Sequence, residues 1–320
     1  MITKEEKNIS GLTLIEIMIG VVISTIMMGA MYTTYNVVNS SYSKVTDKAK
    51  ISRASRDIVT MMMRDIRLAG FKYYLGENSL GIPTKDNLGY ESGATDIKKS
   101  HAPIIIIKNR KGYNPDDWES EEVADLSNSP FCCDRIHIVY GDFNQHDSDA
   151  QLYKRYRITY FADLNEDSLL GLKPKDQYYS IYKTKESWIQ DFNVDIDSNN
   201  SEWTTDATLC PECYVREEVR SHIVDMEFIA NGEDGKRFSP PPRPDEETPT
   251  TASVELFNIR TVDLRLTFRS KNNFFRGDAP VDKPRLVKGI GNRSSEFTDD
   301  RYLRDSVVVT IHTRNIGEDL

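Results

Sequence analysis

The chain begins with a long apolar segment that follows a short polar leader. Residues 12–38 contain a single charged side chain, Glu16, whereas charged and polar residues crowd the leader, residues 1–11. As a helix, the apolar segment would be about 40 Å long, which exceeds the roughly 30 Å of a bilayer core. A carboxylate near the start of such a segment costs about 3 kcal/mol on insertion scales, so we expect Glu16 to have a function.

Helix-compatible sequence continues beyond the apolar segment, because no proline occurs before Pro83. We predict one helix from Leu12 to about Ala69, with Gly70 as the residue that ends it. In the second half of this helix, apolar and small residues recur at steps of three, four or seven, which predicts a stripe that packs on a following domain. The expected stripe is Val45, Ala49, Ser52, Val59, Met62, Ile66 and Ala69.

Beyond residue 72 the pattern changes to short runs of β-branched and aromatic residues. Several of these runs alternate between apolar and polar positions, which is typical of antiparallel strands with one solvated face. The loops between them are long and acidic, and we expect them at 109–130, 184–209 and 231–253. The predicted strands are 103–108, 135–140, 153–161, 178–182, 220–229, 259–268 and 306–313. The fold class is therefore α+β, a long N-terminal helix followed by a mainly antiparallel β head.

Composition narrows the classes of function. Hydrophobic residues make up 38% of the chain and the mean hydropathy is −0.53, so the composition supports a single membrane crossing. The net charge of −9 argues against nucleic acid as a partner, because phosphate binding needs a basic surface. Catalytic motifs such as GxSxG, HExxH and the P-loop are absent from the sequence, and the five histidines are scattered. An enzyme is therefore not expected.

The four cysteines form two clusters, Cys132–Cys133 and Cys210–Cys213. An even number in an exported domain indicates up to two disulfides, with three possible connectivities. Because adjacent cysteines bond to each other only with ring strain, we expect a link between the clusters. A zinc site with four thiolate ligands is the alternative, although the spacing matches zinc knuckles poorly.

A weak candidate for a calcium site lies at Asp163, Asn165 and Asp167, which have the alternating spacing of oxygen ligands in a calcium loop. Ser168 stands where such a loop has glycine, and Pro174 stands where it has a bidentate glutamate. We therefore favour a solvated turn and expect no cofactor.

The leader, Gly11, the apolar run and Glu16 together resemble the class III leader of type IV pilins and pseudopilins. The resemblance implies that prepilin peptidase cleaves after Gly11 and that Leu12, the new N-terminus, is methylated. It also implies that Glu16, at the fifth mature position, pairs with the N-terminal amine of a neighbouring subunit. An uncleaved signal anchor is the alternative interpretation.

Four further stretches resemble the PilW type of minor pilin. They are RDIRLAGF at 64–71, CDRIHIVYGD at 133–142, IRTVDLRLTFRS at 259–270 and LRDSVVVTIHTRNIG at 303–317, in the order of that family. In the second stretch, Cys133 replaces the serine of the family pattern. The resemblance implies the following domains: a leader at 1–11, a transmembrane and filament-core helix at 12–38, its amphipathic continuation at 39–71 and a β-rich head at 72–320.

The same resemblance implies a function in assembling, priming or capping type IV pili. The expected partners are other minor and major pilins, prepilin peptidase, the inner-membrane assembly platform and the lipid bilayer before assembly. The expected location is the inner membrane with a periplasmic head, and later the pilus at the cell surface. A minor pseudopilin of a type II secretion system and a pilus-tip adhesin are the alternatives.

Overall fold

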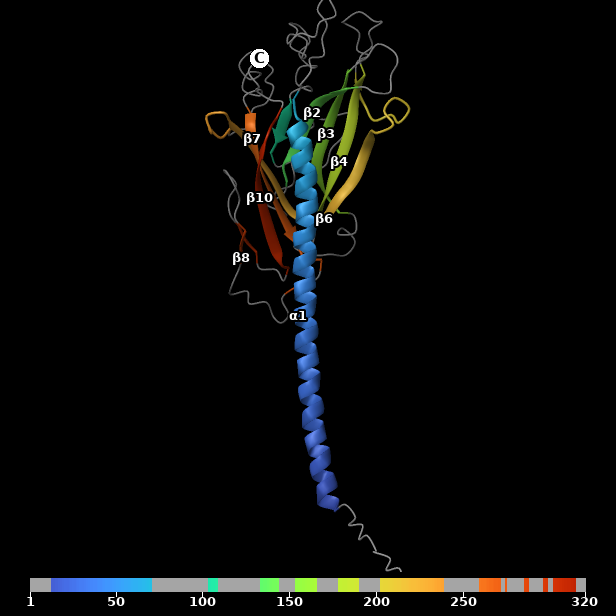
Figure 1. Ribbon diagram of the computed structural model, residues 1–320, viewed down its shortest axis with the longest axis vertical. Helices are drawn as coiled ribbons and strands as arrows, with labels where there is room; N and C mark the ends of the chain where they lie inside the picture. The colour runs from blue at the N-terminus through green and yellow to red at the C-terminus, as the bar shows by residue number, and fades with distance from the viewer. Residues whose placement is uncertain are drawn as a thin grey trace, which may run out of the picture. The chain divides into compact units, whose positions relative to one another are not determined.

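In the computed structural model, the described residues form one helix and a set of β-strands (Figure 1). The chain divides into two compact units. The units are Met1–Lys50 and Ile51–Leu320. The structure describes residues 13–70, 103–108, 133–143, 153–165, 178–189, 202–238, 259–271, 274, 285–287, 296–298 and 302–314.

The helix α1 extends from Leu14 to Leu68, close to the predicted bounds. It ends as expected: Ala69 N–H donates to the Ile66 carbonyl, and Gly70 adopts a φ of 96°, a left-handed conformation that favours glycine. The Gly70 N–H then donates to the carbonyl of Val139 at 3.0 Å. The chain therefore leaves the helix directly onto a strand of the head.

The predicted stripe on α1 is confirmed only in its later part. Val59, Met62, Ile66 and Ala69 are buried, whereas Val45 and Ala49 are exposed and Ser52 is half-buried. The buried face of α1 begins at Ile51 and includes five residues that the periodicity did not identify, Ile51, Ala54, Ser55, Ile58 and Asp65. Val45 and Ala49 belong to the first of the two units, in which the apolar side chains of the helix are exposed.

The head is built on one antiparallel sheet with the strand order β1-β2-β3-β4-β6-β7-β10, and β5 pairs with the end of β4. Every pairing in it is antiparallel, which confirms the predicted fold class. The strands of this sheet are β1 (Ile104–Ile107), β2 (Arg135–Phe143), β3 (Tyr153–Leu164), β4 (Tyr179–Ile189), β5 (Glu202–Thr204), β6 (Tyr214–Gly232), β7 (Ile259–Arg269) and β10 (Arg304–His312).

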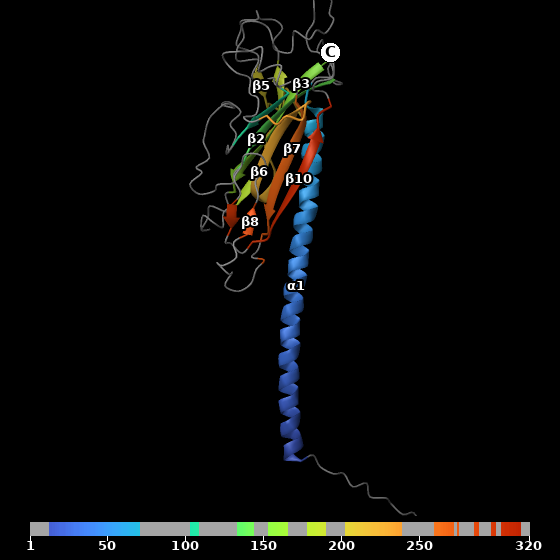
Figure 2. The ribbon, with the colours of Figure 1, turned by 90° about the vertical axis from the view of Figure 1, so that its left-hand side faces the viewer.

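Side-chain alternation gives the sheet two different faces. On β7, Val262, Leu264, Leu266 and Phe268 are buried in the same core as the residues of α1 from Ile51 onward, and Figure 2 shows this strand beside the helix. The intervening positions of β7 are polar, yet Arg265, Thr267 and Arg269 are also buried. One face is therefore an apolar core closed by the helix, and the other is a layer of buried polar groups.

Three short strands were not predicted. β5 lies within the expected loop 184–209, and β4 extends to Ile189 in the same interval. β8 (Arg285–Val287) and β9 (Glu296–Thr298) form a separate two-stranded sheet. Strands of three residues are too short for a periodic pattern to reveal. The expected loop 109–130 and residues 239–253 of the loop 231–253 lie outside the described residues.

The strand β6 is the most irregular element of the sheet. Its register with β4 shifts near Ile223, and so does its register with β7. Within the β4 shift, between Arg220 and Ile223, His222 adopts a φ of 64°, which is uncommon for a residue other than glycine but less so for histidine. At the other end, Gly232, Gly235 and Lys236 form a tight turn, as the sequence NGEDG predicts.

Candidate functional site

The first functional feature is the exposed apolar surface of α1 before Ile51. Its large apolar side chains are exposed from Leu14 to Val45, and its most apolar window, with a mean hydropathy of 2.1, has none of its residues buried. By length and composition, α1 is able to cross a membrane, and it is the one such helix among the described residues. A surface of this kind is stable only against lipid or against other apolar helices.

Hydroxyl groups within this segment are bonded to the backbone of their own helix. Ser24 Oγ donates to the Gly20 carbonyl at 2.7 Å, and Thr25 Oγ1 donates to the Val22 carbonyl at 2.8 Å. Further along the segment, Thr33, Thr34 and Ser40 make equivalent bonds. Because these hydroxyls need no water, they can reside in lipid or in a dry helix bundle.

Two glycines leave gaps on the same segment. A Cβ atom placed on Gly20 or on Gly29 would meet nothing within 4 Å. Small residues of this kind allow the backbones of two helices to approach closely. The segment therefore offers positions where a neighbouring helix can pack.

Glu16 closes a capping box at the start of α1. The backbone N–H and the hydroxyl of Thr13 donate to Glu16 Oε2 at 2.8 and 2.9 Å, and the Thr13 carbonyl accepts the Glu16 N–H at 3.1 Å. The T-x-x-E pattern is a known signature of a helix start, so the sequence contains a signal for this cap. Gly11 and Leu12 lie outside the described residues. Pairing of Glu16 with a neighbouring amine stays a prediction.

In the head unit, a buried carboxylate on α1 bonds to two strands of the sheet. Asp65 is 2% exposed, and its Oδ2 atom accepts a hydrogen bond from Tyr160 of β3 at 2.6 Å. Lys183 of β4 forms an ion pair with the same oxygen at 2.7 Å. Burial and the adjacent Asp65 carboxylate raise the pKa of Tyr160, so its hydroxyl remains a donor. Helical periodicity does not show what a charged side chain will contact, so the sequence does not predict the burial of Asp65.

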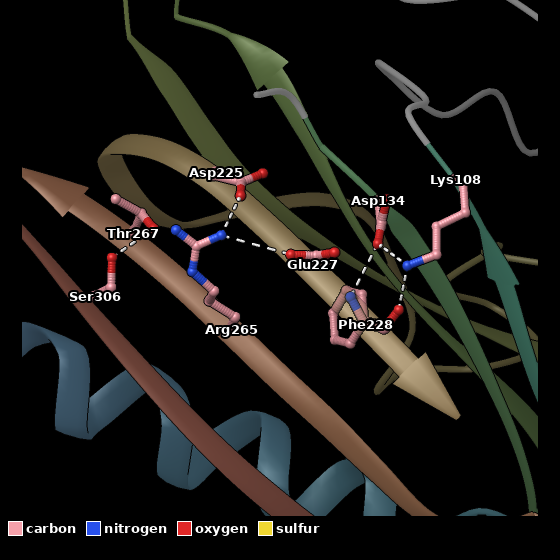
Figure 3. A network of polar contacts seen from close by, with 8 residues as sticks. All are labelled: Lys108, Asp134, Asp225, Glu227, Phe228, Arg265, Thr267 and Ser306. Carbon is pink, nitrogen blue, oxygen red and sulfur yellow. Dashed lines mark hydrogen bonds and ion pairs between the residues drawn. The ribbon is translucent and has the colours of Figure 1, made fainter. Parts of the chain in front are cut away.

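A second polar cluster lies on the sheet at the start of β2 (Figure 3). The Asp134 carboxylate accepts the Phe228 N–H at 2.9 Å and forms an ion pair with Lys108 at 2.7 Å. The Asp134 N–H donates to the Met226 carbonyl at 2.7 Å, and Lys108 donates to the Phe228 carbonyl. Asp134 thus joins β2 to β6, two strands that are not neighbours in the sheet order.

The polar face contains three further buried ion pairs. Arg265 of β7 lies 3.3 Å from Asp225 and 3.5 Å from Glu227, both on β6, and these side chains point toward one another in Figure 3. Arg157 of β3 binds Glu186 of β4 through two hydrogen bonds, at 2.7 and 3.0 Å. Each of these charged groups has a partner of opposite charge on the neighbouring strand. The ion pairs therefore stabilise the pairing of the strands.

The expected disulfide between the two cysteine clusters is wrong. Cys210 and Cys213 bond to each other, with Cα atoms 5.3 Å apart, because a tight turn, in which the Cys213 N–H donates to the Cys210 carbonyl, brings the two thiols together. Cys133 is buried and also disulfide-bonded, and Cys132 lies outside the described residues. A sulfur in a disulfide is not available as a thiolate ligand, so this pairing leaves no four-thiolate zinc site.

The residues of the calcium candidate have protein partners where they are described. Asp163 forms an ion pair with Arg216 at 3.1 Å, and the Asn165 amide donates to Ser180 at 2.8 Å. Asp167 lies outside the described residues. Across the described part of the chain, no three His, Cys, Asp or Glu side chains gather as a metal site would require. His137 and His312 lie in strands β2 and β10, as predicted.

Comparison with known proteins identifies the N-terminal region. Residues 7–32 match the family described as the prokaryotic N-terminal methylation motif. No curated protein and no solved structure matches the chain. The motif supports a type IV pilin-like protein, a class that is structural rather than enzymatic, and it implies processing by prepilin peptidase and association with other pilins. Together with the apolar helix, it is consistent with membrane anchoring.

Proposed function

We propose that this protein is a minor pilin of the PilW type, which helps to assemble, prime or cap type IV pili. The observation that carries the proposal is the match of residues 7–32 to the methylation motif, on a helix whose apolar side chains are exposed from Leu14 to Val45. The four head stretches that resemble PilW support the finer assignment. Three of them contribute to buried parts of the head, through Asp65, Asp134 and the core residues of β7.

In this proposal the chain first resides in the inner membrane, with the head in the periplasm. Prepilin peptidase cleaves after Gly11, and the amine of Leu12 is methylated. The helix then leaves the bilayer and packs among the helices of other pilins, at the assembly platform. Transfer from lipid to a helix bundle gives the apolar side chains little free energy, because the two surroundings are equally apolar.

Other interactions must therefore direct the helix into the filament. Gly20 and Gly29 allow close packing against neighbouring helices. The Glu16 carboxylate, which here accepts hydrogen bonds from Thr13, would exchange or share that contact with the positively charged amine of a neighbouring subunit. An ion pair between Glu16 and that amine would be strong in a medium of low dielectric constant. Because it can form in only one axial register of the two helices, it would fix the position of the incoming subunit along the filament.

The test of this function is mass spectrometry of the N-terminus, on protein from cells with and without prepilin peptidase. We expect a mature chain that begins with methylated Leu12, and an uncleaved chain without the peptidase. A chain that begins at Met1 in both strains would contradict the proposal.

A minor pseudopilin of a type II secretion system remains the second candidate, since the same motif and the same apolar helix would serve it equally. Co-purification separates the two: a PilW-type subunit is recovered with other minor pilins, and a pseudopilin is recovered with components of the secretion system. An adhesin would instead show a defect in surface binding while piliation stays normal.

A further inference from the structure

An antiparallel sheet exposes unpaired N–H and C=O groups wherever a strand lacks a neighbour, and proteins usually cover such edges. Among the described strands of the main sheet, the outer side of β5 and the β7-facing side of β6 before Ile223 lack a neighbour, and so do three further stretches of edge. They are the outer side of β1, the part of β6 beyond its last pair with β4 at Tyr179–Ile223, and the outer side of β10. The three stretches differ in whether other parts of the chain protect them.

The edge of β6 is covered by side chains and backbone from β1 and β2. The Met226 carbonyl accepts from Asp134 N–H, the Phe228 N–H donates to the Asp134 carboxylate, and the Phe228 carbonyl accepts from Lys108 (Figure 3). Successive backbone groups of β6 are thus satisfied although no strand pairs with them there. This edge cannot accept another chain without losing Asp134.

The edge of β1 is short and buried. The strand has four residues, and Ile104, Ile105 and Ile106 are at most 2% exposed. Pro103 precedes the strand, and Lys108, which follows it, is bonded to Asp134. Short length, proline, lysine and burial are the usual means of protecting an edge strand.

The edge of β10 has none of these protections. All nine residues of the strand, Arg304–His312, pair with β7 in one unbroken register. The strand contains no proline, lysine or bulge, and its centre is the β-prone run Val307–Val309. Val308 is 56% exposed, and Ser306, Thr310 and His312 are exposed as well.

The backbone groups on the outer side of β10 can be identified. Thr313 N–H donates to the carbonyl of Arg260, which directly continues the β10–β7 register, so this pair is a hydrogen-bonded one. In an antiparallel pair, hydrogen-bonded and non-hydrogen-bonded residues alternate. The outward N–H and C=O groups therefore belong to Ser306, Val308, Thr310 and His312. Within the part of the chain that the structure describes, no strand pairs with these groups.

We propose that the outer edge of β10 binds an extended segment of a neighbouring pilin-like subunit, which adds a strand to the sheet. This inference rests on the proposed function, since association with other pilins supplies the partner. Backbone hydrogen bonds to Ser306, Val308, Thr310 and His312 hold the segment. The segment carries an apolar residue against Val308 and apolar residues on the opposite face beside the half-buried Val307 and Val309.

A second copy of this chain is the less suitable occupant of the edge. Pairing of β10 with β10 of another copy uses the same surface on both subunits, so the contact is isologous and closes into a dimer. A filament requires a heterologous contact that leaves a further surface open. The strand at the opposite end of the sheet, β1, is a poor second surface for such a contact, because its side chains are buried.

The experiment introduces Val308→Pro into the full-length chain in its native membrane. This variant removes an outward N–H and leaves the bonds to β7 intact, because proline is tolerated on the open side of an edge strand. Val308→Thr, which keeps both the N–H and the β-branched side chain, is the matched control. We expect Val308→Pro to lower co-assembly with other pilin-like subunits about tenfold, and Val308→Thr to leave it unchanged. Wild-type co-assembly of Val308→Pro would overturn the inference.

A second measurement identifies the occupant and does not depend on the folding of a proline variant. A photo-crosslinking amino acid at position 308 is expected to form an adduct with an extended segment of another chain that has a processed prepilin N-terminus. An adduct with a second copy of this chain, or no adduct, would overturn the inference. N-terminal processing is measured in the same sample: a processed chain without the adduct refutes the strand addition alone, whereas an unprocessed chain refutes the proposed function.

Discussion

The two parts of α1 have similar backbone structure and opposite surroundings. From Leu14 to Val45 the apolar side chains are exposed, whereas from Ile51 to Ala69 one face is buried against the sheet. The first part satisfies its hydroxyl groups internally, through bonds such as that of Ser24 to the Gly20 carbonyl. The second part instead directs a charged group, Asp65, to partners on the strands. The first part is therefore suited to exchange one apolar environment for another, and the second is fixed to its own domain.

The largest effect is expected where the second part of the helix meets the sheet. Asp65→Ala leaves the half-buried Lys183 ammonium without its counter-ion and the buried Tyr160 hydroxyl without its acceptor, which should lower the free energy of unfolding of the head by about 3 kcal/mol. Thermal unfolding of the full chain in detergent measures this loss.

The control for that variant lies on the same helix. Asp57→Ala removes an exposed carboxylate and should change the stability by less than about 0.5 kcal/mol. N-terminal processing should be normal in both variants, because the cleavage site belongs to the other part of the chain. Equal stability of the two variants would show that the Asp65 contacts do not hold the helix to the head.

The next effect concerns the disulfide that closes the turn before β6. Replacing Cys210 and Cys213 by alanine should cost about 2 kcal/mol, since a short closed loop constrains the unfolded chain only modestly. The turn also positions Glu212, which accepts a hydrogen bond from Tyr156 at 2.5 Å. Peptide mapping without reduction checks the connectivity, and denaturant unfolding checks the cost. A fragment that joins either cysteine to Cys133 would contradict the assigned pair.

These cases show how far the sequence predicts the molecule. Local signals were sufficient for the helix, its end at Gly70, and the longer strands, because each depends on a residue pattern within one element. The burial of Asp65, the contact of Asp134 with β6 and the disulfide pairing were not predicted, since they depend on segments that are distant in sequence. The capping box of Thr13 and Glu16 is a local signal as well, whereas the strands β5, β8 and β9 are too short to produce a pattern.

A smaller effect should separate the two roles of Glu16 in the first part of the helix. Glu16→Gln keeps a side-chain oxygen for the hydrogen bonds from Thr13 and removes the charge that would pair with a neighbouring amine. We expect it to insert in the membrane normally and to enter filaments about tenfold less often, which corresponds to about 1.4 kcal/mol. Quantitative immunoblots of membrane and sheared-filament fractions measure both steps.

Thr13→Ala is the matched variant for Glu16→Gln. It removes the cap and keeps the carboxylate, so filament incorporation should fall less than in Glu16→Gln. If Thr13→Ala were the more defective of the two, helix capping rather than charge pairing would be the role of Glu16. Thermal unfolding of the head should be the same in both variants, which confines the effect to the first part of α1.

The smallest effect is a dependence of head stability on pH, which the first part of the helix should not share. Burial, and then the positive charges of Arg269, Lys271 and Arg220, lower the pKa of His222 to about 4. The unfolded chain, with an ordinary histidine pKa near 6.5, binds the proton more readily, so stability is complete above about pH 6.5 and falls as the pH is lowered to 4. Because His222 is only half-buried, we expect a loss of about 1 kcal/mol.

The variant His222→Asn, in which asparagine tolerates the positive φ, should flatten this part of the curve of stability against pH. The same substitution at the exposed His312 should not. Identical slopes for the wild type and His222→Asn between pH 6.5 and 4 would contradict the assignment.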